Sequence, residues 1–298
     1  MIQIQKHGVF LHDITVHMVT FPGAKINIGL RITEKRQDGF HNIETLFFPI
    51  PLCDALEFVE SENQNKGDML TVTGLDTGGN PEDNLVMKAV RKLRETCSFP
   101  YLKMHLHKAI PAGAGLGGGS SDAAFILKGI NRCYGLKLDN NKLRSISLEL
   151  GSDCPFFIDS VPAFAGGRGE ILEPCTKPLL ENYYMILLNP GINVNTREAY
   201  QNCRPAIPMQ TLSEIIENHT PEKWKDLIIN DFEDYAFERF PLIGHLKEEL
   251  YRSGAIFSLM SGSGSSVYAI FRNRHTIPEK LRGYVIWQGY LRQPIRAR

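Results

Sequence analysis

Apolar and polar residues begin to alternate regularly at residue 24. Within residues 24–32, isoleucine and leucine side chains alternate with Lys25, Asn27, a glycine and an arginine, and this period of two predicts a half-buried strand. Asp38-Gly39 supplies turn residues, so residues 42–48 are predicted to form the returning strand of a hairpin. Because alternate residues of a strand share a face, we expect Lys25 and Asn27 to emerge on the same side.

Helical spacing of apolar residues dominates much of the remaining chain. The predicted helices cover residues 84–96, about 120–132, 141–150, 212–217, 224–237 and 243–253. Short strand-like stretches lie between residues 57 and 73, and clearer strands are predicted at 102–107, 183–188 and 267–271. Since strands and helices mix without a regular βαβ order, the pattern favours an α+β fold in two lobes over a doubly wound sheet.

Three segments are predicted along the chain. Residues 1–17 carry no clear pattern and are expected to be an N-terminal extension, with Met18 standing where a shorter chain could start. Residues 18–178 are predicted to form a first domain that contains a glycine-rich segment. A loop-rich stretch after Pro174 then leads into a second domain, residues 179–298.

Charge and hydropathy narrow the possible partners and location of the protein. The 33 basic and 33 acidic side chains cancel, so no overall field favours nucleic acid or an anionic membrane. Residues 2–19 show no signal-peptide pattern, and the longest apolar run, 183–188, is too short to cross a bilayer. Six scattered cysteines without a C-x-x-C pair indicate reduced thiols. We therefore predict a cytoplasmic protein with neither a nucleic-acid nor a membrane partner.

Metal binding by side chains is not predicted. His105 and His107 alternate on a predicted strand and lack cysteine partners, so they are expected to face solvent rather than to bind zinc.

The segment Pro111–Ala124 carries the most specific chemistry. It places five glycines within seven residues between a predicted strand and a helix that starts near Ser120. Glycine lets the backbone approach a ligand closely, and the amide N–H groups at a helix N-terminus attract anions. Ser120 and Ser121 can cap this helix or contact phosphate oxygens. The segment is therefore predicted to bind a polyphosphate.

Other nucleotide-binding motifs fit this segment less well. It contains G-x-G-x-x-G, but the acidic residue and βαβ unit of a dinucleotide site are missing. No lysine follows Gly119, as a Walker A loop requires, and protein-kinase motifs are absent. A plain packing turn would need fewer glycines than this.

Three segments resemble the motifs of the GHMP kinase superfamily, and they occur in the order found in that family. Ala24–Asn27 resembles the first motif, Pro111–Ala124 the second, and Ser261–Ser266 the third, so the resemblance extends from about residue 20 to 272. It implies ATP-dependent phosphorylation of a small alcohol, with Mg²⁺ accompanying ATP. It also implies an N-terminal lobe like ribosomal protein S5 and a ferredoxin-like C-terminal lobe.

Four further elements resemble one subfamily, the diphosphocytidyl-methylerythritol kinases. They are Arg36–His41, Glu82–Leu85, Gly151–Phe157 and Gly167–Glu170. This resemblance implies that the acceptor is the 2-hydroxyl of a cytidyl diphosphate alcohol on the non-mevalonate route to isoprenoid precursors. Phe40 stands where the subfamily carries tyrosine, which keeps an aromatic face and loses a hydroxyl.

Catalytic and acceptor-binding roles follow from the same resemblance. Asp153 is implied as the catalytic base and Lys25 as its cationic partner. The implied acceptor-binding residues, besides Asp153, are Asn27, Phe40, His41, Thr196 and Tyr200. The cytosine base of the acceptor is expected to lie between the rings of Phe40 and Tyr200, with His41 at its polar edge. Taken alone, Asp153 fits a turn or helix cap equally well, Lys25 a strand lysine reaching solvent, and the two aromatic rings core packing.

The resemblance also implies a set of ATP-binding residues. They are Asn84, Lys108, Pro111, Gly113, Gly115, Leu116, Gly117, Gly118, Gly119, Ser120 and Ser121. Lys108 lies on the otherwise apolar face of its strand and is expected to neutralise phosphate, and one of the two serines is expected to lie near Mg²⁺. Two rival functions stay open, a GHMP kinase for another alcohol such as homoserine and a ligand sensor without activity. A monomer or weak homodimer is expected.

Overall fold

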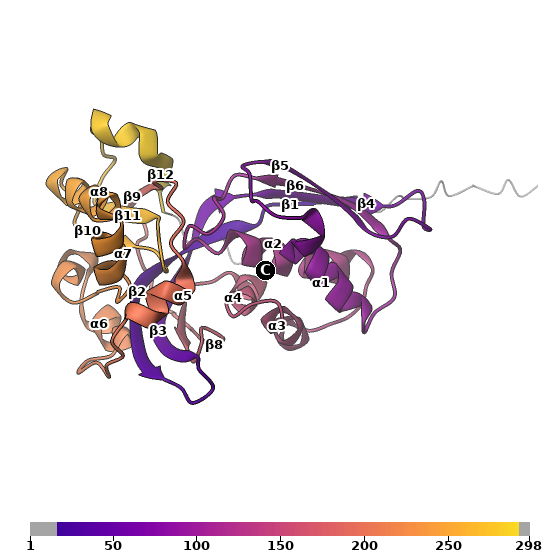
Figure 1. Ribbon diagram of the computed structural model, residues 1–298, viewed down its shortest axis with the longest axis horizontal. Helices are drawn as coiled ribbons and strands as arrows, with labels where there is room; N and C mark the ends of the chain where they lie inside the picture. The colour runs from indigo at the N-terminus through magenta and orange to yellow at the C-terminus, as the bar shows by residue number, and fades with distance from the viewer. Residues whose placement is uncertain (1–16, 292–298) are drawn as a thin grey trace, which may run out of the picture.

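The structure is a computed structural model of the 298-residue chain and describes residues 17–291. The predicted extension at residues 1–17 therefore lies outside the described residues except for its last position. Within the described part, strands form three four-stranded sheets, with the orders β1-β4-β6-β5, β2-β3-β7-β8 and β10-β11-β9-β12. Figure 1 shows two lobes, with the hairpin of β2 and β3 running between them.

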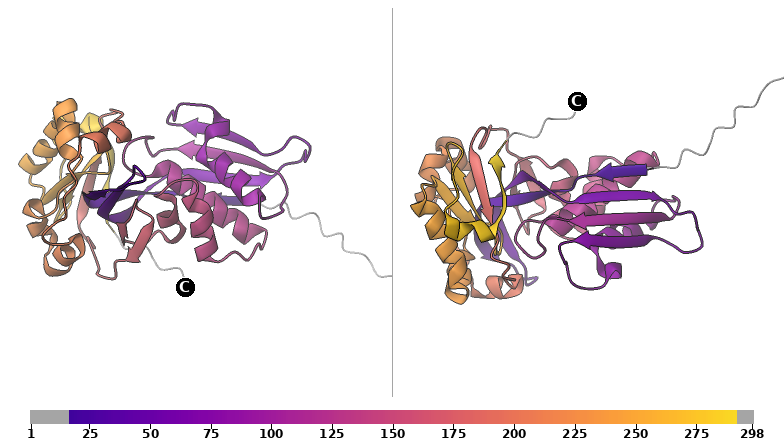
Figure 2. Two further views of the ribbon diagram at one scale, coloured as in Figure 1. Left: turned by 60° about the horizontal axis from the view of Figure 1, so that its bottom comes forward. Right: turned by 90° about the horizontal axis from the view of Figure 1, so that it is seen from above.

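The N-terminal lobe contains the first two sheets and four α-helices. Its strands are β1 (His17–Thr20), β2 (Gly23–Lys35), β3 (His41–Cys53), β4 (Ala55–Glu60), β5 (Met69–Gly74), β6 (Leu102–Lys108), β7 (Ala163–Gly166) and β8 (Ile171–Pro174). Its helices are η1 (Pro81–Asp83), α1 (Leu85–Arg94), α2 (Gly118–Cys133), α3 (Asn140–Leu148) and α4 (Cys154–Asp159). In Figure 2 the sheet β1-β4-β6-β5 lies on one side of this lobe and the helices cover its inner face.

The C-terminal lobe packs helices around the third sheet. Its strands are β9 (Tyr184–Leu188), β10 (Phe257–Met260), β11 (Val267–Phe271) and β12 (Val285–Tyr290). Its helices are α5 (Thr196–Asn202), α6 (Leu212–Asn218), η2 (Pro221–Asp226), α7 (Glu233–Arg239), α8 (Pro241–Arg252) and η3 (Glu279–Tyr284). The mixture of helices with sheets that are antiparallel except for the parallel pair β5–β6 confirms the predicted α+β class, whereas the domain boundary at 178/179 stays a prediction.

The β2–β3 hairpin joins the two lobes. The two strands pair antiparallel, as the alternating pattern predicted. The apolar side chains of Ala24, Ile26 and Ile28 pack with residues of the C-terminal sheet, including Leu187 and Tyr268. Because neighbouring residues of a strand point to opposite faces, the polar side chains between them face the N-terminal lobe. The hairpin therefore has one lobe on each of its two faces.

A predicted continuous helix over residues 224–237 is wrong. The segment forms η2 and α7, and the chain between them runs alongside β2. Leu30 N donates to Ile229 O, and Asp231 N donates to Leu30 O, both at 2.9 Å. Backbone pairing with β2 replaces the helical hydrogen bonds there, which the apolar spacing alone did not indicate. The other predicted helices and strands are present with small shifts at their ends.

Among residues 17–291, no helix has both the length and the apolar character needed to span a membrane.

Candidate active site

Lys25 lies at the centre of the site and is almost completely buried, with 4% of its side chain exposed. Its Nζ donates to Asn27 Oδ1 at 2.7 Å and lies 3.3 Å from Asp153 Oδ2. The same ammonium lies 4.8 Å from the centroid of the Phe47 ring. Burial rules out a strand lysine that reaches solvent. A buried ammonium requires a counter-charge, and Asp153 provides it.

Asn27 connects Lys25 to the third glycine-rich segment. Its side-chain Nδ2 donates to Thr45 Oγ1 at 2.9 Å, which fixes the amide and leaves Oδ1 facing Lys25. Asn27 N donates to Ser261 Oγ at 3.2 Å, and Tyr268 Oη donates to Asn27 O at 2.9 Å. The predicted common face of Lys25 and Asn27 is confirmed by the hydrogen bond between their side chains.

Asp153 precedes helix α4, yet its side chain makes no capping hydrogen bond among the described residues. The Asp153 carboxylate therefore does not cap helix α4. Its side chain is 34% exposed, enough to reach a ligand, while the ion pair with Lys25 holds it in place. A carboxylate oxygen held in this way can accept a proton from a bound hydroxyl, as a general base must.

The glycine loop ends in the first turn of α2. The predicted start near Ser120 is confirmed to within two residues, because the N-cap is Gly117 and the helix begins at Gly118. Gly117 has a φ of 69°, and a Cβ there would lie 2.8 Å from the Phe157 ring. No side chain of the described residues caps this end, so the N–H groups of residues 118–120 have no helical acceptor. They lie at the positive end of a 16-residue helix, an arrangement suited to binding an anion.

The loop is tied to both other motifs. Lys25 N donates to Leu116 O at 2.9 Å, while the Leu116 side chain is buried in the core between the lobes. Ser261 Oγ donates to Gly115 O at 2.8 Å. The three segments that suggested the superfamily are thus in direct contact, although Asn27 and Ser261 are 234 positions apart in the sequence.

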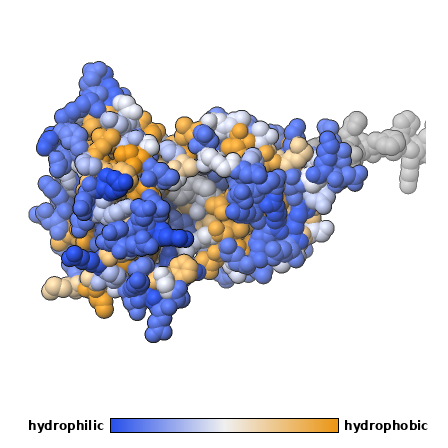
Figure 3. Space-filling view, viewed as in Figure 1, coloured by the Kyte–Doolittle hydropathy of each residue, from blue (hydrophilic) through white to orange (hydrophobic). Residues whose placement is uncertain are grey.

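Most of the predicted site residues line one cavity of about 390 Å³. Figure 3 shows the surface hollowed between the two lobes, where this part of the molecule lies. The predicted residues that line the cavity are Lys25, Asn27, Pro111, Gly113, Gly115, Gly117, Gly118, Gly119, Ser120, Asp153, Thr196 and Tyr200. Asp153 and the glycine loop therefore face the same space. Thr196 reaches it from α5, where its Oγ1 shares a hydrogen bond of 2.8 Å with Ser263 Oγ.

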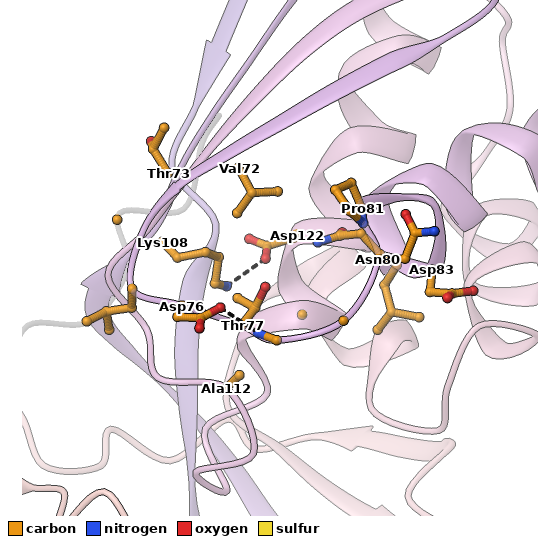
Figure 4. Close-up of a pocket in the computed structure, with 17 residues that line it drawn as sticks. Val72, Thr73, Asp76, Thr77, Asn80, Pro81, Asp83, Lys108, Ala112 and Asp122 are labelled. Atoms are coloured by element: carbon orange, nitrogen blue, oxygen red, sulfur yellow. Dashed lines mark hydrogen bonds and ion pairs between the residues drawn. The ribbon is translucent and has the colours of Figure 1, made fainter.

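A second cavity of about 530 Å³ adjoins the first and shares Leu85, Ala112 and Gly119 with it. Figure 4 shows it between the end of β5, the loop that follows and the start of α2. Asn84 and Lys108, both predicted to bind ATP, line this second cavity. Asn84 Oδ1 accepts from Val86 N at 2.9 Å and so caps α1.

Lys108 is buried between two carboxylates. Its Nζ donates to Asp54 and, at 2.7 Å, to Asp122 Oδ2. Lys108 lies on the buried face of β6, as predicted, whereas His105 and His107 face outward. Because two carboxylates already compensate its charge, Lys108 is not the free phosphate-binding cation that the sequence suggested, and its contact with ATP stays a prediction.

Burial raises the pKa of Asp122 from 3.8 to about 7. A carboxyl whose pKa is higher in the folded than in the unfolded state stabilises the fold below its unfolded pKa, and this stabilisation is lost as the pH rises through the folded pKa. Between pH 5 and pH 8, the wild type should therefore lose more stability than Asp122→Asn, which does not titrate. Thermal melts of both proteins at the two pH values test this, and parallel changes in Tm would contradict it.

The residues predicted to hold the cytosine base of the acceptor are arranged in an unexpected way, and of Phe40, His41 and Tyr200 only Tyr200 lines the first cavity. His41, rather than Phe40, faces Tyr200, with ring centroids 4.9 Å apart and an interplanar angle of 19°. Phe40 is 52% exposed, which excludes core packing, and the Arg168 guanidinium lies 4.8 Å from its centroid. A base between Phe40 and Tyr200 would thus require His41 to leave its present position.

Phe40→Ala is expected to weaken binding of the cytidyl acceptor by ~5–10-fold, because one aromatic stacking face is lost. ATP affinity should not change, since Phe40 lines neither cavity. Equilibrium titration of each ligand separately measures both effects. Equal losses for the two ligands would argue against a stacking role.

Several site residues were not predicted. Arg168 and Phe232 line the first cavity, and Asp122 lines the second. The sequence could have indicated Arg168 as a site residue, since it lies between two glycines of the subfamily element Gly167–Glu170. Asp122 follows Ser121 directly at the end of the glycine segment. Ser121 itself is buried and lines neither cavity, and its Oγ has no hydrogen-bond partner among residues 17–291.

The fold and the phosphate-binding loop define a class of phosphotransferase, and comparisons with known proteins agree. Residues 84–167 match the family described as GHMP kinases N terminal domain, and residues 211–284 match GHMP kinases C terminal. A crystal structure of 4-(cytidine 5'-diphospho)-2C-methyl-D-erythritol kinase superposes with a TM-score of 0.73 at 30% identity, covering 91% of this chain and 98% of that one.

Curated relatives narrow the class. The 4-diphosphocytidyl-2-C-methyl-D-erythritol kinase of Bacteroides thetaiotaomicron is 49% identical over 88% of this chain and 95% of its own length. That of Parabacteroides distasonis is 45% identical over 92% of this chain and 100% of its own. The chain therefore belongs to the GHMP kinase family and, within it, to the 4-diphosphocytidyl-2-C-methyl-D-erythritol kinases. It is an ATP-dependent phosphotransferase.

Proposed function

We propose that the enzyme transfers the γ-phosphoryl group of ATP to the 2-hydroxyl of 4-diphosphocytidyl-2-C-methyl-D-erythritol, a step of the non-mevalonate route to isoprenoid precursors. The observation that carries this proposal is the Lys25–Asp153 ion pair of 3.3 Å, which faces the glycine loop across one cavity. The identity with the curated relatives supports the choice of acceptor.

Each part of the site has one task in this reaction. The N–H groups at the start of α2 hold the phosphates of ATP, whose nucleoside occupies the second cavity. Asp153 accepts the proton of the acceptor hydroxyl as the oxygen attacks the γ-phosphorus, and ADP leaves. Lys25 holds the Asp153 carboxylate in position and stabilises negative charge on the transferred group. Asn27 fixes Lys25, and Phe40, His41, Thr196 and Tyr200 hold the cytidyl acceptor.

Mg²⁺ fits this site as a partner of ATP rather than of the protein. Among the described residues, no group of three or more histidine, cysteine or acidic side chains could hold a metal ion. Of the two serines, Ser120 lines the first cavity and is the hydroxyl beside the phosphate loop, whereas Ser121 is buried. When bound to the ATP phosphates, Mg²⁺ would neutralise their charge.

The expected setting of this reaction is the cytoplasm, with a monomer or weak homodimer acting on small molecules and without nucleic acid.

Release of ADP, measured in a coupled assay with several alcohols, tests the function. The cytidyl alcohol should stimulate ADP release at least ~100-fold over buffer, since positioning of both reactants governs the rate. Homoserine and galactose serve as control acceptors and should give no stimulation. Stimulation by homoserine instead would assign the enzyme to another GHMP kinase activity, and no stimulation by any alcohol would favour a ligand sensor.

A further inference from the structure

The carboxylate of Asp122 is buried, and only one of its two oxygens has a hydrogen-bond partner. Its side chain is 2% exposed, and Oδ2 accepts from Lys108 Nζ at 2.7 Å. Oδ1 is buried and has no hydrogen-bond partner among residues 17–291. An unpaired buried acceptor of this kind is costly unless a ligand supplies a donor. Asp122 lines the second cavity, as Figure 4 shows.

The neighbouring carboxylate offers no donor to an ionised Asp122. Asp54 Oδ1 accepts from Ala109 N and Ile110 N, and its other oxygen accepts from Lys108. Lys108 is held between the two acids and is 3% exposed. The three side chains thus form a buried cluster that leaves one acceptor, Asp122 Oδ1, without a partner among residues 17–291, in a residue that lines the second cavity.

The position of the cavity indicates which part of ATP meets this oxygen. With the phosphates at the start of α2, the nucleoside extends into the adjoining space. The ribose hydroxyls gain from water near the exposed Gly78–Asn80 rim, whereas the flat base gains from burial against Val72 and Leu85. The base therefore takes the buried end, beside Lys108 and Asp122.

We propose that Asp122 selects the phosphoryl donor by its base, with Oδ1 accepting a hydrogen bond from the 6-amino group of adenine. This inference rests on the proposed use of the second cavity by ATP. An ionised carboxylate oxygen can only accept hydrogen bonds, so it favours an amino group and disfavours a carbonyl at that position. Because Oδ2 is already bonded to Lys108, Asp122 offers the base a single contact.

Direct binding of nucleotides, without acceptor, tests the inference at pH 8, where the carboxyl is ionised. Purine riboside triphosphate, which has hydrogen in place of the 6-amino group, should bind the wild type ~10–100-fold more weakly than ATP, because a charged acceptor is left unpaired. In Asp122→Asn, whose amide oxygen faces Lys108 and whose NH₂ group faces the base, this preference should fall to about twofold or less. Inosine triphosphate, with a carbonyl at position 6, should bind the variant more tightly than the wild type.

Two controls and one outcome in the wild type separate the possible results. Glu82→Gln removes an exposed carboxylate close to the cavity but outside its lining, and it should keep the wild-type preference. Equal binding of ATP and purine riboside triphosphate to the wild type would overturn the inference, even if the variant does not fold. A loss with 2′-deoxy-ATP that depends on Asp122 would place a ribose hydroxyl there and also overturn it.

Failure of this inference differs from failure of the proposed function. If the cytidyl alcohol stimulates ADP release but the base preference does not depend on Asp122, only the inference fails. If the preference depends on Asp122 but no alcohol is phosphorylated, the proposed function fails.

Discussion

Asp153→Asn is expected to lower kcat by ~10²–10⁴-fold, because asparagine cannot accept the proton of the acceptor hydroxyl. ATP affinity should stay within about twofold of wild type, since Asp153 does not line the second cavity and is not part of the phosphate loop. Steady-state turnover with the cytidyl acceptor, together with separate titration of ATP, measures both quantities.

A matched control lies at the other end of the short helix that Asp153 precedes. Asp159 is at the opposite end of α4 and pairs with Arg144 on the surface, away from both cavities. Asp159→Asn removes the same charge from the same helix and should leave kcat unchanged. Turnover of Asp153→Asn close to wild type would remove this carboxylate from the chemistry, whatever the control shows.

Gly115→Ala is expected to abolish measurable turnover and to destabilise the fold by ~2–5 kcal/mol, through strain and overpacking. Gly115 has a φ of 76°, and an added Cβ would lie 1.9 Å from the Ser261 carbonyl oxygen. The nearest atoms belong to the backbone of Ser261 and Gly264, which cannot rotate away as a side chain could. The added methyl group would therefore push the phosphate loop away from the third motif. Chemical denaturation and nucleotide titration would show the loss of stability and of binding.

Gly135→Ala is a control that measures the cost of the backbone conformation alone, without the steric contact that an alanine at Gly115 would make. Gly135 also has a positive φ, 58°, but an added Cβ would meet nothing within 4 Å. This variant should cost ~1–2 kcal/mol from the backbone conformation alone and keep full ATP affinity. If Gly115→Ala were no worse than Gly135→Ala, the close contact between the two glycine-rich segments would not matter for function.

Local patterns predicted the parts of the site that depend on neighbours in sequence. The alternation around Lys25 fixed both its strand and the face it shares with Asn27, because strand periodicity is a local property. The glycine loop was equally visible, since glycine at positions of positive φ and a following helix occur within one short segment.

Contacts between distant residues were not predictable from such patterns. Asp54, Lys108 and Asp122 come from three separate segments, and nothing local indicates that their side chains meet. The stacking of His41 on Tyr200 depends in the same way on how α5 packs beside the hairpin. Tertiary packing decides these contacts, and it also decides the break between η2 and α7.

A crystal structure of the ternary complex with a non-hydrolysable ATP analogue and the cytidyl alcohol would test the account most directly. We predict the γ-phosphate at the N–H groups of residues 118–120 and the 2-hydroxyl ~2.6–3.2 Å from the Asp153 carboxylate. A hydroxyl bound beyond about 6 Å from that carboxylate, or phosphates bound away from the start of α2, would contradict it.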